Sequence, residues 1–194
     1  MKHSRIAGVG GMLVLVATAA LALVATASAG KIFSEPIDAT ESNIEEDFCG
    51  VEGLTVDFTS HILGRVQAVA HGRDQLPYFG FNLKITDVVT NLANGNDVVS
   101  ESTVRDKDLR VTDNGDGTLT VLVLSTGNSV LYGEDGKVIA RNPGQVRFEI
   151  LVDHGGTLSD PSDDTNLAFL GVVKESTGRS DDYCESAVPI LLGD

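Results

Sequence analysis

The sequence predicts an all-β protein, most simply a single antiparallel barrel of about eight strands with little helix. Between Leu109 and Val152, apolar-rich runs alternate with short segments in which Gly stands beside Asn, Asp or Pro. These segments favour tight turns between antiparallel strands, because Gly, and more weakly Asn and Asp, tolerate positive φ. No amphipathic helical period longer than a turn or two interrupts the pattern. A β-sandwich of the same strands is the alternative.

Alternating apolar residues define the expected strands. From Arg147 to Val152 every second residue is apolar, which is typical of a half-buried strand. The alternation from Leu54 to Ala70 continues for 17 residues. A flat strand of that length would span roughly 56 Å, which is too long for a small domain. We therefore expect a bend or bulge near Ser60 or Gly64, as at a barrel corner.

Two segments are apolar on both faces, Leu119–Leu124 and Leu167–Val173. A strand of this kind has to be covered on both sides. We expect another part of the chain to lie across the outside of the sheet. The candidates are the N-terminal lead-in, residues 30–53, and the short apolar tail Ser186–Leu192.

The first 29 residues have the form of a signal peptide. A short basic start, Met1–Arg5, precedes an apolar run that extends to about Ala25, and Ala27-Ser28-Ala29 offers the small residues that signal peptidase needs. An uncleaved anchor is the alternative, because the apolar run is long for a signal. We interpret residues 1–29 as a signal peptide, 30–53 as an extended lead-in and 54–194 as the barrel domain of a secreted protein.

The expected mature chain is strongly acidic. Of the 14 Lys and Arg residues, Lys2 and Arg5 lie in the leader, which leaves 12 against 28 acidic residues and a net charge near −16. Such a surface repels phosphate backbones and anionic lipids. The charge therefore argues against nucleic-acid partners and, once the leader is removed, against a membrane. The oligomeric state stays open.

Cys49 and Cys184 are the only two cysteines and stand near the two ends of the mature chain. In an exported protein a disulfide between them is the expected state. It would close a loop of more than 130 residues. The chain-entropy model gives such a loop up to about 5 kcal/mol of stabilisation. Two separate thiols are the alternative.

No motif identifies a catalytic site. The sequence has no Gly-x-Ser-x-Gly, and His61, His71 and His154 have no neighbours that mark a nucleophile. His61, Arg65 and His71 lie on one polar face of the long alternating segment and are candidate polar groups of a pocket. A zinc site on that face would need a third ligand, such as His154 or Asp153.

Two loops are rich in acidic residues, and one of them is a candidate calcium-binding site. The sequence Asp113-Asn114-Gly115-Asp116-Gly117 resembles a calcium loop, but Gly occupies its third and fifth positions, and a hairpin turn explains every residue. The longest loop, Asp153–Thr165, places four carboxylates within twelve residues. The possible calcium ligands are Asp153, Asp160, Asp163 and Asp164. A solvated acidic loop is the simpler interpretation.

The hairpin region resembles a known group of proteins. The run T-D-N-G-D-G-T-L-T-V-L-V-L-S-T-G-N-S-V-L-Y-G-E-D-G-K-V-I-A-R-N-P-G-Q-V-R-F-E is similar to that of small exported proteins of actinobacteria, which have two end cysteines in like places. The resemblance covers most of the mature chain. It implies a secreted single domain and assigns no functional residue. A more distant likeness, to lipocalin-like and allene-oxide-cyclase-like barrels, rests on strand count, and the chain lacks the Trp of the lipocalin signature.

The expected function is that of a secreted, non-enzymatic binding protein, with a small apolar ligand in a barrel pocket. Two apolar faces could line or fill that pocket: Leu54, Val56, Phe58 and Ile62 on one strand, and Phe79, Phe81, Leu83 and Ile85 on the next. The first alternative is a barrel enzyme of the cyclase or isomerase type. The second is an extracellular structural or adhesion module with a calcium-binding acidic loop.

Overall fold

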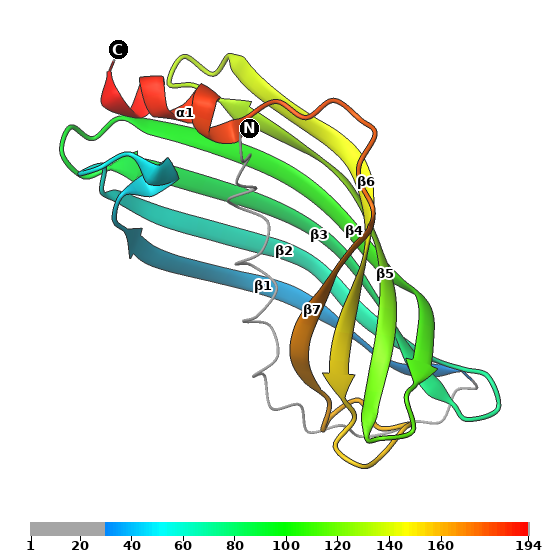
Figure 1. The fold of residues 1–194 in the computed structure, drawn as a ribbon. Coiled ribbons are helices and arrows are strands. Elements are labelled where there is room, and N and C mark those ends of the chain that lie inside the picture. The colour runs from blue at the N-terminus through cyan, green and yellow to red at the C-terminus, as the bar shows by residue number, and fades with distance from the viewer. Residues whose placement is uncertain (1–29, 194) are drawn as a thin grey trace.

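A computed structural model describes residues 30–193, and the predicted signal peptide lies outside them. Seven antiparallel strands form one sheet in the order β1-β2-β3-β4-β5-β6-β7, so every strand pairs only with its neighbours in sequence (Figure 1). Their bounds are β1 Lys31–Glu45, β2 Val56–His71, β3 Leu76–Asn91, β4 Asp97–Asp113, β5 Thr118–Tyr132, β6 Val138–Asp153 and β7 Thr165–Lys174. The all-β, antiparallel prediction is confirmed.

The sheet is not closed into a barrel, so the choice between a barrel and a sandwich stays a prediction. A barrel requires the first and last strands to pair, but β1 pairs only with β2 and β7 only with β6. The strands number seven rather than about eight. Turn chemistry determines each hairpin locally, whereas closure depends on the twist and curvature that accumulate over the whole sheet.

A row of glycines crosses the sheet where its long strands bend. Gly64 pairs with Leu83, Leu83 with Val104, Val104 with Gly127, and Gly127 with Gly144. A Cβ on Gly64 would lie 2.1 Å from the Asn82 carbonyl oxygen, and one on Gly127 would lie 2.3 Å from that of Thr103. Only glycine permits such close approach of neighbouring backbones. We call this row the glycine crease.

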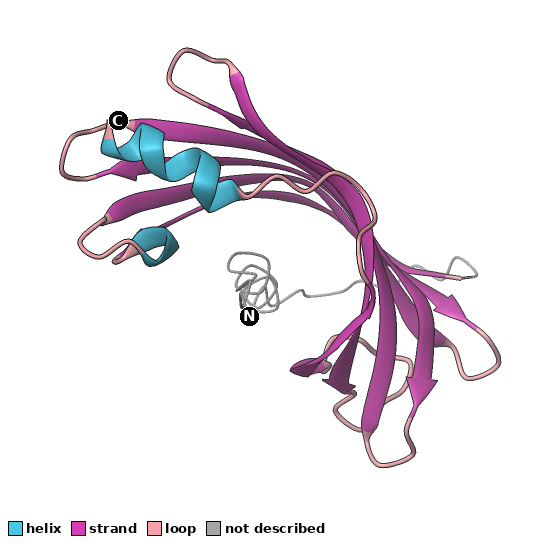
Figure 2. Ribbon diagram, turned by 45° about the horizontal axis from the view of Figure 1, so that its top comes forward, coloured by secondary structure: helices cyan, strands magenta, loops and turns pink. Residues whose placement is uncertain are grey.

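The crease confirms the predicted bend in β2 and explains its form. The β2–β3 register continues through Gly64 without a shift, so β2 bends there without a bulge. Figure 2 shows the sheet curving through the middle of its strands. The bulge lies instead in β4, between Asp108 and Arg110. The crease divides the sheet into two halves.

A C-terminal helix, α1 (Tyr183–Leu192), covers one half on the inner side of the curve (Figure 2). Nine buried residues form the core between α1 and the sheet, two of them from α1 itself: Phe48, Leu54, Val56, Val89, Val98, Leu131, Ala140, Ala187 and Leu191. The Cys49–Cys184 disulfide joins α1 to the 3-10 helix η2 (Phe48–Gly50), as predicted. The predicted apolar tail therefore does cover the sheet, but as a helix on the inner face. We call this half the helix-covered half.

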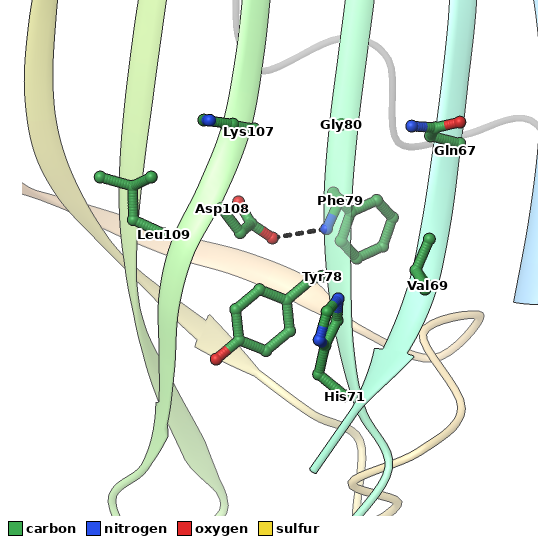
Figure 3. A pocket seen from close by; sticks show the side chains of 9 residues that line it. All are labelled: Gln67, Val69, His71, Tyr78, Phe79, Gly80, Lys107, Asp108 and Leu109. Carbon is green, nitrogen blue, oxygen red and sulfur yellow. Dashed lines mark hydrogen bonds between the residues drawn. The ribbon is translucent and has the colours of Figure 1, made fainter. Parts of the chain in front are cut away.

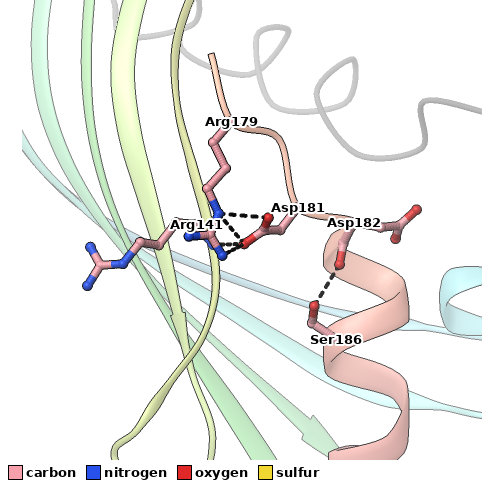
Figure 4. Close-up of polar contacts among 5 residues, drawn as sticks. All are labelled: Arg141, Arg179, Asp181, Asp182 and Ser186. Atoms are coloured by element: carbon pink, nitrogen blue, oxygen red, sulfur yellow. Dashed lines mark hydrogen bonds and ion pairs between the residues drawn. The ribbon is translucent and has the colours of Figure 1, made fainter.

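Asp181 and Asp182 position α1 at the end of the connector from β7 (Figure 4). Asp181 Oδ2 accepts a hydrogen bond from the backbone N–H of Arg141 on β6 at 2.9 Å and pairs with the Arg179 guanidinium. Asp182 is the N-cap: its Oδ1 accepts from the Glu185 N–H at 3.0 Å. A side chain at this position satisfies a backbone donor that the first helical turn leaves free.

The other half, which we call the open half, contains a second core cluster and the strand β7. The cluster consists of Val111, Leu119, Val121, Val123, Phe148 and Val152, with Leu76, Tyr78 and Leu158 among the residues packed against it. The predicted two-sided cover over Leu167–Val173 is absent among residues 30–193, because β7 is an edge strand whose apolar side chains are exposed. The lead-in contributes the opposite edge as β1 and does not cross the outside of the sheet.

Candidate functional site

An open pocket of about 480 Å³ lies in the open half, where β3 and β4 separate (Figure 3). Three strands supply its walls: Gln67, Val69 and His71 from β2, Tyr78, Phe79 and Gly80 from β3, and Lys107, Asp108 and Leu109 from β4. Its volume falls in the usual range for small-molecule sites, roughly 300–1,000 Å³. The lining combines apolar, aromatic and charged groups.

The pocket forms because the β3–β4 ladder stops. Gly80 and Lys107 are the last residues to pair, and the bulge after Asp108 turns β4 away from β3. Two side chains replace the missing ladder bonds. The Phe79 N–H donates to Asp108 Oδ2 at 2.7 Å (Figure 3), and the Val111 N–H donates to the Tyr78 hydroxyl at 3.1 Å. The backbone groups at the gap are thus satisfied by side chains that also line the pocket.

Asp108 is the most perturbed acid of the pocket. Burial raises the pKa of its carboxyl to about 7, against the lowering effect of the Phe79 N–H, and the nearby Asp106 carboxyl raises it further. Burial also raises the pKa of Asp106, whose Oδ1 is buried with no hydrogen-bond partner within residues 30–193. Near neutral pH, Asp108 can therefore both donate and accept a proton.

His71 and Tyr78 form the aromatic wall of the pocket. Their ring centroids lie 4.6 Å apart, and in Figure 3 both rings stand beside the gap between β3 and β4. Lys107 supplies a cation on the same side, and Val69 and Leu109 add apolar surface. This arrangement can hold a flat apolar group against the rings and an acceptor group near the lysine.

The three predicted pocket residues on β2 share one face but not one site. His61, Arg65 and His71 alternate with residues on the inner face of the sheet, and the β2 register is continuous between them. His71 lines the pocket. His61 Nε2 lies 3.1 Å from Asp38 Oδ1, and the Arg65 guanidinium donates to Ser34, so both contact β1 instead. A zinc site that uses His61 with His71 has no geometric support.

The two predicted apolar faces do come together, on the inner face of the sheet. Ile62 pairs with Ile85, and Val66 pairs with Phe81. The Phe79 ring centroid lies 5.9 Å from that of Phe33 and 6.5 Å from that of Phe81. The two series form one continuous surface of an open sheet rather than the wall of a closed cup.

The acidic loop Asp153–Thr165 contains the predicted calcium ligands. Asp163 accepts from the Thr157 hydroxyl at 3.0 and 2.9 Å, and Asp160 accepts from the Ser162 N–H. Partial burial, together with the charges of Asp163, Asp160 and Asp153, raises the pKa of Asp164 to about 6. Within residues 30–193, no three or more His, Cys, Asp or Glu side chains are grouped as a metal ion requires. The predicted calcium ligands thus lie in one loop, where Asp153, Asp160 and Asp163 are near enough to raise the pKa of Asp164, and calcium binding there stays a prediction.

Sequence reasoning missed Tyr78, Lys107 and Asp108. Tyr78 lies 29 residues before Lys107 in the sequence. Lys107 and Asp108 lie in a polar stretch that contains no local motif. One signal was present. The inward-facing positions of β4 are Val98, Ser100, Ser102, Val104, Asp106 and Asp108. Two acids therefore occupy the inner face of this strand, where apolar or small side chains precede them.

Comparison with family models, with curated proteins and with solved structures finds no match to this chain. Within residues 30–193, no helix has the length and apolar character needed to cross a membrane.

Proposed function

We propose that this is a secreted, non-enzymatic protein that binds a small, partly apolar ligand in the pocket between β3 and β4. The observation that carries the proposal is the separation of these strands beyond Gly80 and Lys107, which leaves about 480 Å³ lined by both apolar and charged groups. A strand break that served only to turn the chain would not need a buried acid, a histidine and a lysine around it.

The lining indicates a ligand with a flat apolar body and an anionic or hydrogen-bond-accepting group. The His71 and Tyr78 rings offer a stacking surface, and Val69 and Leu109 extend it. Lys107 suits an anionic group, and protonated Asp108 can donate a hydrogen bond to an acceptor. A purely aliphatic ligand would leave these polar groups unpaired.

Export is part of the proposal. The Cys49–Cys184 disulfide is of the kind that persists in oxidising compartments. A strongly acidic composition and a signal-like leader in the sequence support the same location.

The test uses 1-anilinonaphthalene-8-sulfonate, which combines fused apolar rings with an anion, and follows its fluorescence on titration with the disulfide-bonded protein. We expect saturable binding that Lys107→Gln weakens several-fold and that a negative charge on the apolar wall, Val69→Asp, nearly abolishes. The matched control is Lys84→Gln, because Lys84 is exposed on β3 and does not line the pocket.

Native mass spectrometry of the protein purified from the medium of its own cells provides a second readout. A retained small molecule that Val69→Asp releases would support the proposal. Equal dye binding by wild type, Lys107→Gln and Val69→Asp, together with no retained molecule, would refute it.

A second candidate function is an enzyme of the isomerase or cyclase type at the same pocket. The observation that favours it is the Asp108 carboxyl, whose pKa of about 7 suits a general acid or base at neutral pH. The retained molecule, once released and incubated with fresh protein, would then change its chromatographic retention at constant mass. Asp108→Asn would stop the conversion but leave binding of the dye intact.

A further inference from the structure

The edge strand β7 carries an apolar surface that nothing within residues 30–193 covers. Five of its ten residues are large apolar side chains that are 46–62% exposed: Leu167, Phe169, Leu170, Val172 and Val173. We call them the β7 patch. Scattered apolar residues on a surface are ordinary, but a contiguous group on an unpaired sheet edge marks a contact surface.

The β7 patch is also free of charge in a strongly acidic chain. From Thr165 to Val173 no residue is ionisable, and charges occur only at its two ends. Asp163 and Asp164 precede the strand, Lys174 is its last residue, and Glu175 follows it. A partner for this surface therefore needs a neutral apolar centre, with a cation at one end and an acid at the other.

The backbone of β7 is unsuited to extending the sheet by a regular ladder. Its register with β6 shifts between Arg147 and Phe148, between Glu149 and Ile150, and between Leu151 and Val152. Bulges of this kind interrupt the row of N–H and C=O groups that another strand would need. A partner must therefore bind mainly through the side chains of the β7 patch.

We propose that the occupant of the β7 patch is the same surface of a second copy of this chain, related by a two-fold axis. Such a contact places the uncharged centre of one copy on that of the other, so no charge is buried at its centre. It also runs the two strands in opposite directions. Each Lys174 then lies beside the acidic end of the other β7.

The area of the β7 patch predicts weak association. Five side chains that are about half exposed offer on the order of 400–500 Å² per copy, roughly half of what each partner buries in a standard interface. We expect the dimer to dissociate at concentrations on the order of 10–100 µM.

The test is sedimentation velocity of the disulfide-bonded protein from 1 to 500 µM. Wild type should pass from monomer to dimer and no further. Leu170→Lys should remain monomeric, because it places two cations near the axis, and Leu92→Lys, which alters an exposed leucine in the turn after β3, should behave as wild type. Circular dichroism confirms the fold of each variant. Should Leu170→Lys not fold, Val173→Lys serves the same purpose.

A charge exchange tests the contact between the Lys174 end of one β7 and the acidic end of the other. Lys174→Glu and Asp163→Lys should each weaken association about five-fold or more, and the double variant should recover most of the loss, because the pair is restored with reversed sign. A wild type that stays monomeric at 500 µM overturns the proposal. So does association that Leu170→Lys leaves unchanged, growth beyond a dimer, or a double variant as weak as the singles.

Discussion

The two halves of the sheet, on either side of the glycine crease, differ in how completely their polar groups are satisfied. In the helix-covered half the buried polar side chains are paired: Ser60 and Ser100 both donate to Asp87, and the Asn91 amide donates to the Leu191 carbonyl. In the open half, Asp106 Oδ1, Arg147 Nε and His154 Nδ1 are buried with no partner among residues 30–193. The raised carboxyl pKa values, those of Asp106, Asp108 and Asp164, also belong to this half.

This difference indicates that the two halves of the sheet have different roles. Pairing of every buried polar group makes a half stable and leaves it chemically inert. Desolvated acids and unpaired donors are costly, and they are found where a ligand or partner is recognised. The helix-covered half thus holds the fold together, and the open half is where we locate function.

The largest effect should come from cutting the disulfide that holds α1. Replacing Cys49 and Cys184 together by Ser removes a link across 135 residues of sequence. We expect a loss of about 3–5 kcal/mol in the free energy of unfolding, measured with urea. Dye binding at the β3–β4 pocket should persist below the new midpoint. Loss of dye binding while the sheet remains folded would show that the two halves are not independent.

A smaller effect should follow from opening the core beneath α1. Leu191 is fully buried, whereas its neighbour Leu192 is 43% exposed. Leu191→Ala should cost about 2–5 kcal/mol, because it leaves a cavity against Val89 and Val98, and Leu192→Ala about 0.5 kcal/mol or less. The measurement is chemical denaturation of both variants. Equal losses would contradict the packing of α1.

The crease should tolerate no side chain at Gly127. A Cβ there would lie 2.3 Å from the backbone oxygen of Thr103, so Gly127→Val should destabilise by about 1–3 kcal/mol or more. The control is Gly133→Ala, where the nearest neighbour would lie at an ordinary 3.6 Å. Thermal melts of the two variants give the comparison, and a Gly127→Val as stable as Gly133→Ala would show that the bend has another cause.

The next effect concerns the pH dependence of stability and arises in the open half. Because the folded state raises the pKa of Asp108 from 3.8 to about 7, it holds a proton that the unfolded chain has released. Ionising Asp108 therefore penalises the folded state, and stability should fall by about 4 kcal/mol between pH 4 and pH 8, since one pKa unit corresponds to about 1.4 kcal/mol. Asp108→Asn should remove this fall, so that the variant exceeds wild type at pH 8 and matches it at pH 4.

Asp116→Asn is the control for this pH effect. Hydrogen bonds from Thr118 lower the pKa of the exposed Asp116 carboxyl, so its charge favours folding at neutral pH and that benefit disappears in acid. The variant should be less stable than wild type near pH 7 and should match it in strong acid. Parallel pH profiles for both substitutions would mean that Asp108 is not desolvated.

Local patterns were sufficient for much of the fold. The alternation and turn residues predicted an antiparallel all-β chain, Gly64 as a bend, and the Cys49–Cys184 bridge. The helix α1 was missed because Pro189 and a short apolar run favour an extended tail, although its N-cap Asp182 and its C-cap Gly193 are both in the sequence.

The open edges and the pocket could not be predicted in the same way. Whether β1 meets β7 depends on curvature accumulated across all the strands, and no short segment encodes it. The pocket arises where one ladder stops, so its residues converge only after β3 and β4 have separated. Of the three candidate polar groups, His61, Arg65 and His71, only His71 lines the pocket, because residues that share one face of a strand can still lie far apart along it.

The position of α1 at the end of the chain has a consequence for the order of folding. Each hairpin joins consecutive strands and can form as soon as both strands have been synthesised. The cover over Val56 and Val89, by contrast, consists of residues 183–192 and is locked by a bond to a cysteine 135 positions earlier. A nascent chain therefore carries a complete sheet with an uncovered apolar half until residues 183–192, which follow all seven strands, have emerged. For that interval, protection from aggregation has to come from outside the chain.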